Sequence, residues 1–248
     1  MTDPHLLVQR DAGVVTLEFN RREKKNAITT GMYAALADAL ADAAADDAVA
    51  VALLQGQADL FTSGNDVRDF LAPPDASDRP AHRFLRTLAT FPKPIVAAVG
   101  GPAIGIGTTM LMHCDFVLAA TESRFQLPFV PLGLCPEAGS SLLLPQLAGH
   151  RLAAQLLLLG DSFDAEVAKE AGIVTTIVES ESLLAESRAL ADRLARLPRD
   201  AMRTTKALLR RPLGGTPLEA IEAEYPEFVR LLATDEARAI MGAFLNRK

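Results

Sequence analysis

The sequence predicts an α/β domain with a largely parallel β-sheet, followed by a helical C-terminal segment. Three short apolar runs have the length of buried strands, and longer segments with helical periodicity lie between them. Strands that alternate with helices imply right-handed crossovers, which join parallel neighbours in a sheet. A chain of 248 residues is long enough to bury a sizeable core in one domain of this class.

The N-terminal half supplies most of the expected sheet. Residues 6–9 and 14–19 are apolar or alternating, and Asp11-Ala12-Gly13 lies between them, which predicts a β-hairpin. Residues 30–47 place apolar side chains on one face and aspartates on the other, which indicates a helix. Further strands are expected at residues 49–54, 95–99 and 115–120, with helices at residues 81–90 and 107–114.

The chain after Gly149 has mainly helical patterns. Helices are expected at residues 150–159, 165–171, 182–197, 199–210, 217–233 and 235–246, with one strand at residues 174–178. A break at Leu197-Pro198 divides the chain into a core domain, residues 1–197, and a helical segment, residues 198–248.

Composition and charge exclude several classes of partner. The formal net charge of −6 argues against a general nucleic-acid binder, which needs a basic face to neutralise phosphates. Two local basic clusters, residues 21–25 and Lys206 with Arg210-Arg211, still leave room for a small phosphorylated ligand.

Cysteine usage and targeting signals predict the compartment. Cys114 and Cys135 have no cysteine or histidine at metal-ligand spacing, so we expect no zinc site. The N-terminus lacks the basic and apolar regions of a secretory signal, and the apolar runs are interrupted short of a membrane span. We therefore expect a cytoplasmic protein with reduced thiols and no membrane partner.

Two glycine-bearing turns could each direct backbone N–H groups into a site. In residues 60–67, Gly64 permits an unusual backbone angle, although the same residue types dominate ordinary surface turns. Residues 100–109 form a glycine-rich turn from a strand into a helix, where free N–H groups favour an anion. Tight packing of the helix on the strand explains these glycines equally well. Neither a dinucleotide fingerprint nor a Walker loop is present.

A third segment, residues 131–141, carries one carboxylate in an apolar loop. Desolvation would raise the pKa of Glu137 and suit it to proton transfer near neutral pH. A structural alternative is a first-turn glutamate that complements a helix dipole. Cys135 is a candidate nucleophile, but no histidine lies near it in sequence, so we interpret it as a small buried filler.

The order and spacing of these segments resemble the enoyl-CoA hydratase/isomerase (crotonase) family over nearly the whole chain. The resemblance implies a crotonase-like fold of repeated ββα units with a helical C-terminal trimerisation segment. The matching motifs are Asn20-Arg21-Arg22-Glu23-Lys24-Lys25-Asn26-Ala27, with Arg22 where proline is usual, Phe61-Thr62-Ser63-Gly64-Asn65-Asp66-Val67, residues 93–107, Asp115, residues 125–139 and residues 159–168.

The resemblance also implies a set of site residues. The backbone N–H groups of Asn65 and Ile106 should hold the thioester oxygen of an acyl-CoA, whose coenzyme A is part of the substrate, so no separate cofactor is expected. The protein should form a homotrimer or a dimer of trimers, with Phe244 packed on the nucleotide of a neighbouring subunit. Residues expected to contact coenzyme A are Lys24, Lys25, Ala27, Ser63, Gly64, Asp66, Val67 and Phe244, with Lys206 as a further candidate.

The acidic side chains bear on which reaction the resemblance implies. Thr109 and Phe129 occupy the two positions at which hydratases of the family carry catalytic glutamates, so hydration by two glutamates is not expected. Glu137 alone resembles the acid of peroxisomal-type Δ3,Δ2-enoyl-CoA isomerases, which need one base. The alternatives are an unusual hydratase, a dienoyl-CoA isomerase, a thioester hydrolase, or a non-catalytic acyl-CoA-binding protein.

Overall fold

The computed structural model describes residues 3–66 and 80–210, together with Glu219, Tyr225, Arg230, residues 234–237 and Ala239. Two of the expected site residues, Val67 and Phe244, lie outside the described residues, as do most of the helices expected at 217–233 and 235–246.

The main sheet has six strands in the order β1-β2-β3-β4-β6-β9. The antiparallel hairpin of β1 and β2 was predicted, and every later neighbour in the sheet is parallel. The predicted strand at 95–99 matches β4 in both bounds. The strands are β1 (Leu6–Asp11), β2 (Val14–Phe19), β3 (Val51–Gln55), β4 (Ile95–Val99), β6 (Phe116–Ala120) and β9 (Thr176–Val178).

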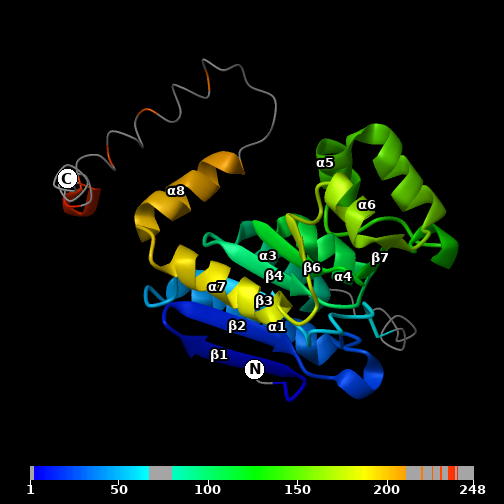
Figure 1. Ribbon diagram of the computed structural model, residues 1–248, viewed down its shortest axis with the longest axis horizontal. Helices are drawn as coiled ribbons and strands as arrows, with labels where there is room; N and C mark the ends of the chain where they lie inside the picture. Colours follow the sequence, from blue (N-terminus) through cyan, green and yellow to red (C-terminus); the bar gives the residue numbers. More distant parts are fainter. Residues whose placement is uncertain are drawn as a thin grey trace.

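Helices cover both faces of this sheet. On one face, the helix α1 (Thr30–Ala45) packs against α3 (Pro80–Thr90), and both join the larger apolar core. On the other face, α7 (Leu183–Ala195) lies across the central strands (Figure 1). Successive residues of β3 and β4 alternate between the two cores, as a strand requires. The central strands are therefore buried on both faces.

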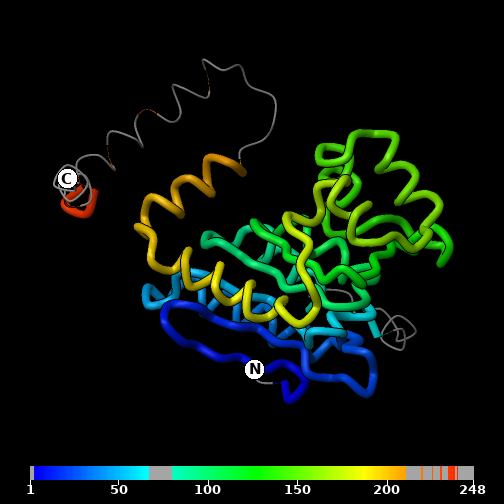
Figure 2. Tube along the Cα trace, in the orientation of Figure 1, coloured from blue at the N-terminus to red at the C-terminus, as the bar shows by residue number. Residues whose placement is uncertain are grey.

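The helix α7, late in the chain, packs back against the N-terminal hairpin of β1 and β2. In Figure 2, the yellow helix α7 runs beside the dark blue hairpin of β1 and β2. A Cβ placed on Gly13 would lie 3.6 Å from the Cβ of Ala195, and Arg188 forms an ion pair with Asp11 at 2.7 Å. Together, α1 and α7 cover opposite faces of the sheet.

A second, three-stranded sheet was not predicted. It consists of β5 (Pro102–Ile104), β7 (Arg124–Gln126) and β8 (Phe163–Asp164), in that order. β5 begins directly after the glycines that end β4, so this small sheet sets the direction of the chain where β4 leaves the main sheet. The short helical segments α4 (Ile106–Thr109) and η2 (Met110–His113) follow β5, where a helix at 107–114 was predicted.

The helix predicted from residue 150 follows a break at Gly149, and a further helical stretch that was not predicted precedes it from Ser140. α5 spans Ser140–Ala154 and continues into η4 (Gln155–Leu159). Gly149 interrupts it with φ 75° and ψ 159°, and Pro145 lies inside it. Within the 20 residues Ser140–Leu159, an 18-residue window has a mean hydropathy of 1.3, so by length and composition alone the segment could cross a membrane, which the prediction of short apolar runs had not anticipated. The break at Gly149 makes this segment two helices of different direction.

Two further helices lie within residues 80–210, and the predicted break lies between the second of them and α7. α6 spans Ala165–Glu170 and α8 spans Arg199–Leu209. The break expected at Leu197-Pro198 lies between α7 and α8. The division into residues 1–197 and 198–248 stays a prediction.

Candidate active site

The loop of residues 61–66 is held between two other segments, as if it were a short strand. The Thr62 N–H donates to Pro102 O at 3.0 Å, and Thr62 O accepts the Ile104 N–H at 3.2 Å. On its other side, the Ile28 N–H donates to Gly64 O at 2.8 Å, and Ile28 O accepts the Asp66 N–H at 2.9 Å. The loop therefore has a defined position beside β5, although it contains no regular strand.

Gly64 is required where this loop passes β5. Its φ is +88°, and an added Cβ would lie 2.5 Å from the backbone oxygen of Ile104. Side chains rarely adopt this backbone angle, and a contact that short would force the two segments apart. Gly107 makes a similar approach, because its Cβ would lie 2.7 Å from Cγ2 of Thr62. The loop thus packs closely on β5 at Gly64 and on the start of α4 at Gly107.

This contact places the N–H groups of Asn65 and Ile106 on neighbouring segments. Within the described part of the chain, neither N–H has a hydrogen-bond partner. Ile106 is the first residue of α4, so its N–H has no carbonyl within the helix. The Asn65 side chain is held separately, because the Tyr33 hydroxyl of α1 donates to its Oδ1. The two backbone donors predicted from the sequence remain available to a ligand oxygen.

Glu137 reaches the same helix from the loop that follows η3 (Val130–Leu132). The Thr109 hydroxyl of α4 donates a hydrogen bond to Glu137 Oε1. Burial raises the pKa of Glu137 above its ordinary value, and this hydrogen bond opposes part of the increase. Because Thr109 lies three residues after Ile106, the carboxyl group is one helical turn from a free N–H. A base and a hydrogen-bond donor are therefore close together.

The two positions that carry acids in hydratases are apolar or neutral here. Thr109 is fully buried, and the Phe129 side chain is part of the larger apolar core. In the described ranges, no group of three or more histidine, cysteine or acidic side chains could hold a metal ion. The chemistry that this arrangement can perform is proton transfer by one carboxyl group beside two N–H donors.

The predicted coenzyme A segment forms a folded unit with the 57–66 region. Asn26 is fully buried, and its Nδ2 donates to Phe61 O at 2.9 Å. Arg21 donates to Ala27 O at 2.9 Å and forms an ion pair with Asp66 at 2.8 Å, so the Asp66 carboxylate is engaged within the protein. Ser63 is joined to this unit because its N–H donates to Lys25 O at 2.9 Å.

Lys24 and Lys25 remain exposed at the edge of this unit. Neither forms an ion pair with a described residue, so both ammonium groups are free to meet an anion. Lys25 has a φ of 51°, which directs the chain from the 3-10 turn Arg22–Lys24 into the buried Asn26. The geometry therefore leaves the two lysines next to the loop that carries Asn65.

Two expectations from the sequence are wrong. Lys206 is not available to a ligand phosphate, because it is 5% exposed, and its Nζ donates to Lys93 O at 2.5 Å and to Asp115 Oδ2 at 2.6 Å. Lys93 is also buried, and its Nζ donates to Ala43 O and Asp46 O. Cys135 is exposed rather than a buried filler. The sequence pattern did not reveal that α8 turns its lysine toward the sheet.

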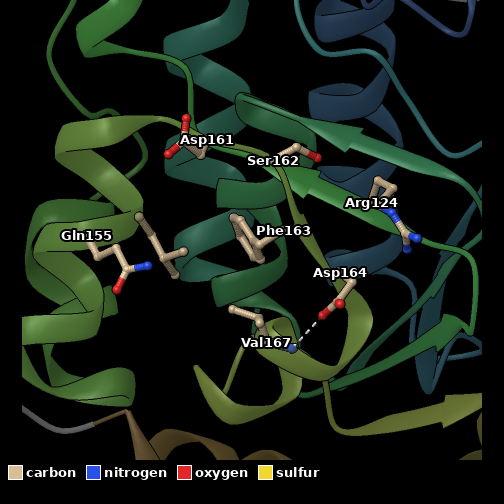
Figure 3. A pocket seen from close by; sticks show the side chains of 8 residues that line it. Arg124, Gln155, Asp161, Ser162, Phe163, Asp164 and Val167 are labelled. Atoms are coloured by element: carbon tan, nitrogen blue, oxygen red, sulfur yellow. Dashed lines mark hydrogen bonds between the residues drawn. The ribbon is translucent and has the colours of Figure 1, made fainter.

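A separate cavity of about 510 Å³ lies between the small sheet and the helices that follow it. Figure 3 shows Phe163 between Gln155 of η4 and Arg124 of β7, with Asp164 accepting a hydrogen bond from the Val167 N–H at 2.9 Å. None of the four site residues Asn65, Ile106, Thr109 and Glu137 lines it. This cavity is therefore distinct from the site at the start of α4.

The chain belongs to the enoyl-CoA hydratase/isomerase family, whose sequence profile matches residues 9–248. It is an enzyme of the crotonase class, a family that acts on acyl-CoA thioesters, and it has the crotonase-like fold that the sequence motifs implied, whereas the C-terminal trimerisation segment stays a prediction.

Named relatives include both isomerases and hydratases. Enoyl-CoA delta isomerase 2 of Rattus norvegicus is 37% identical over 83% of this chain and 54% of its own length. The human protein of that name is 33% identical over 98% of this chain and 64% of its own length. The 2,3-dehydroadipyl-CoA hydratase of Escherichia coli is 32% identical over 98% of this chain and 96% of its own. The chain thus spans only about half to two thirds of the two isomerases.

Solved structures agree over the full chain. A protein of Magnetospirillum magneticum has 41% identity and a TM-score of 0.96, covering 100% of this chain and 98% of its own. An enoyl-CoA hydratase/isomerase of Pseudoalteromonas atlantica has 40% identity and a TM-score of 0.81, covering 98% of each chain. These similarities establish the family and leave the reaction to be argued from the site.

Proposed function

We propose that this enzyme is a Δ3,Δ2-enoyl-CoA isomerase, which moves a double bond from C3 to C2 of an acyl-CoA. The observation that carries the proposal is the hydrogen bond between Glu137 and Thr109, three residues from the Ile106 N–H. An isomerase needs one base beside an oxyanion hole, whereas a two-glutamate hydratase needs acids at both Thr109 and Phe129. The isomerase relatives in rat and human add support.

In the proposed mechanism, Glu137 acts as both base and acid. Its carboxylate takes a proton from C2, and the negative charge develops on the thioester oxygen as a dienolate. The N–H groups of Asn65 and Ile106 stabilise that oxygen, and one such donor is worth about 3 kcal/mol in the transition state. Glu137 then returns the proton at C4, which leaves the double bond at C2. No water and no second acid take part.

The environment of Glu137 suits a group that must accept a proton and release it again. Its pKa is raised by burial, so the carboxylate is a stronger base than an exposed glutamate. The Thr109 hydroxyl stabilises the charged form and offsets part of the rise in pKa. These opposing effects favour proton transfer in both directions.

We further propose how the enzyme binds the coenzyme A part of its substrate and how its subunits assemble. Lys24 and Lys25 contact the phosphates of coenzyme A, and the segments around Ala27, Ser63 and Gly64 contact the rest of it. Val67 and Phe244 are proposed contacts that lie outside the described residues. The enzyme works in the cytoplasm as a homotrimer or a dimer of trimers, without a resident cofactor. Sedimentation as a monomer at micromolar concentration would contradict the assembly.

The decisive experiment compares Glu137→Gln with the wild type on a 3-enoyl-CoA. We expect kcat to fall by roughly 10²- to 10⁴-fold, the usual cost of losing a general base. Binding of coenzyme A should be nearly unchanged, because glutamine has almost the same shape. Since the proton is transferred in the transition state, the loss should appear in kcat rather than only in KM.

Matched controls and a second reaction test the alternatives. Neither Thr109→Ala nor Phe129→Leu should abolish isomerisation, because neither residue supplies an acid, although Thr109→Ala also removes the hydrogen bond to the Glu137 carboxyl group. Hydration of a 2-enoyl-CoA is measured in parallel for every variant. Wild-type isomerisation by Glu137→Gln would overturn the mechanism, and so would rapid hydration by a wild type that never isomerises.

A further inference from the structure

Thr109 ends α4, and His113 ends the 3-10 turn η2 that follows it directly. His113 also contacts the loop that carries Glu137. His113 is the last residue of η2, and its Nε2 lies 2.8 Å from the backbone oxygen of Ala138. A carbonyl oxygen can only accept a hydrogen bond, so Nε2 carries the hydrogen and donates it. Residues 109 and 113 of one continuous helical stretch thus bond to residues 137 and 138 of one loop.

Ala138 has a backbone conformation that alanine rarely adopts. Its φ is +54°, in the left-handed region, which is unfavourable for a residue with a Cβ. Gly139 follows with φ +70°, where glycine adopts this angle without that cost. A strained residue persists only where its surroundings hold it, and the contact on the Ala138 carbonyl comes from His113.

The His113 ring is itself fixed in place. Burial lowers its pKa, so at neutral pH the imidazole is uncharged and has a single N–H, the one that the Ala138 contact requires. The backbone of the same residue is held from the end of α8, because Arg210 donates to His113 O at 3.0 Å. The histidine therefore links the loop of Glu137 to the end of α8.

We infer that His113 is a positioning residue for the proton transfer. By holding Ala138 O, it keeps Ala138 left-handed and aims the preceding Glu137 carboxyl group at Thr109 and the free Ile106 N–H. Thr109 and His113 fix two successive residues of the loop from one helical stretch, so the carboxyl group has little freedom to rotate away. This inference rests on the proposed role of Glu137.

The test uses His113→Leu, which removes the donor, and His113→Gln, whose Nε2 can replace it. We expect kcat for 3-enoyl-CoA isomerisation to fall about 10- to 100-fold in His113→Leu, since a displacement of about 1 Å can cost 10²-fold. KM should change little, and His113→Gln should recover most of the loss. Adding Ala138→Gly to His113→Leu should restore part of kcat, because glycine adopts the left-handed conformation without strain.

A double variant separates positioning from general stability. In Glu137→Gln there is no carboxylate to aim, so adding His113→Leu should cause no further loss of residual turnover. A further loss of 10-fold or more, or wild-type kcat in His113→Leu, would overturn the positioning role. The proposed function has its own outcome, because retained isomerisation in Glu137→Gln alone refutes it whatever His113 does. Circular dichroism of each variant confirms that the compared proteins are folded.

Discussion

The hydroxyl of Thr109 donates a hydrogen bond to the carboxyl group of Glu137, 28 residues away in sequence. Thr109 thus occupies a position that carries an acid in hydratases. It does not supply an acid itself, but its hydroxyl donates a hydrogen bond to the one acid at the site, Glu137. The contact explains how a single carboxylate can lie beside Ile106 although it comes from a separate loop.

Thr109→Val should shift the pH dependence of isomerisation without abolishing it. The hydroxyl lowers the pKa of Glu137 by stabilising the carboxylate, so its removal should raise that pKa further. Because the base must be ionised, kcat rises with pH through the pKa, and the rising limb should move to higher pH. The measurement is kcat across the acidic and neutral range. A limb in the wild-type position would mean that the hydroxyl has no influence on the carboxylate.

Glu137→Gln should be more stable than the wild type at high pH, and this advantage should shrink as the pH falls. A carboxyl group whose folded-state pKa is raised by burial contributes its stability below the unfolded pKa and loses it as pH rises through the folded pKa. Glutamine cannot ionise and avoids this loss. Thermal unfolding should give a higher Tm for the variant above neutral pH and a shrinking difference below it. A difference in Tm independent of pH would contradict the raised pKa.

Gly64→Ala should lower kcat by roughly 10²- to 10³-fold, the usual cost of losing one oxyanion donor. The added Cβ would lie 2.5 Å from Ile104 O, so the loop must move and carry the Asn65 N–H away from its position. Gly13→Ala is the matched control, because Gly13 has a similar φ of +83° but its nearest atom is 3.6 Å away. Both variants should lose stability, whereas only Gly64→Ala should lose turnover. An equal loss of kcat in Gly64→Ala and Gly13→Ala would show that backbone strain, rather than movement of the Asn65 N–H, is responsible.

Lys24→Gln and Lys25→Gln should each weaken binding of coenzyme A by about two- to five-fold at low salt, the range of one exposed ion pair. The wild-type affinity should fall as salt rises, and the variants should show a smaller dependence because fewer charges are screened. Lys169→Gln removes an equal charge from exposed α6 and should leave the affinity unchanged. Isothermal titration at two salt concentrations measures all three. An affinity insensitive to salt in the wild type would exclude the phosphate contacts.

Much of the main sheet could be predicted because each strand is specified by its own residues. Residues 95–99 form a continuous apolar run between Pro94 and Gly100, so both ends of β4 are marked in the sequence. The strands β5, β7 and β8 have two or three residues each, and they exist only because distant segments pair, as Phe125 does with Ala103 and Phe163. The part of α5 before Gly149 was missed because Pro145 and Gly149 usually end a helix; Gly149 does interrupt α5, but the residues from Ser140 onward are already helical before it.

The candidate site was predictable as a set of segments but not as a set of contacts. Family motifs identified Asn65, Ile106 and Glu137, and the free N–H groups follow from a glycine turn that opens a helix. The partners Thr109 and His113 were not predicted, because the conformation of the loop from 133 to 139 depends on left-handed angles at Ala138 and Gly139. An alanine at such an angle has no signal in sequence. Lys206 was misread for a related reason, since burial of a lysine depends on the carbonyls and carboxylate that tertiary structure brings to it.

The two buried lysines have a consequence for how the molecule comes apart. Lys93 Nζ holds the last carbonyls of α1, and Lys206 Nζ holds both the Lys93 carbonyl and Asp115, whose Oδ2 also accepts the Ile95 N–H. If α8 detached from the sheet, the Lys93 carbonyl and the partly exposed Asp115 carboxylate would lose the buried ammonium group of Lys206 that pairs with them. Local fraying of α8 is therefore disfavoured. The amides of α8 should exchange with solvent deuterium about as slowly as the amides of β4. The α8 helix would then open together with the sheet, in one cooperative transition.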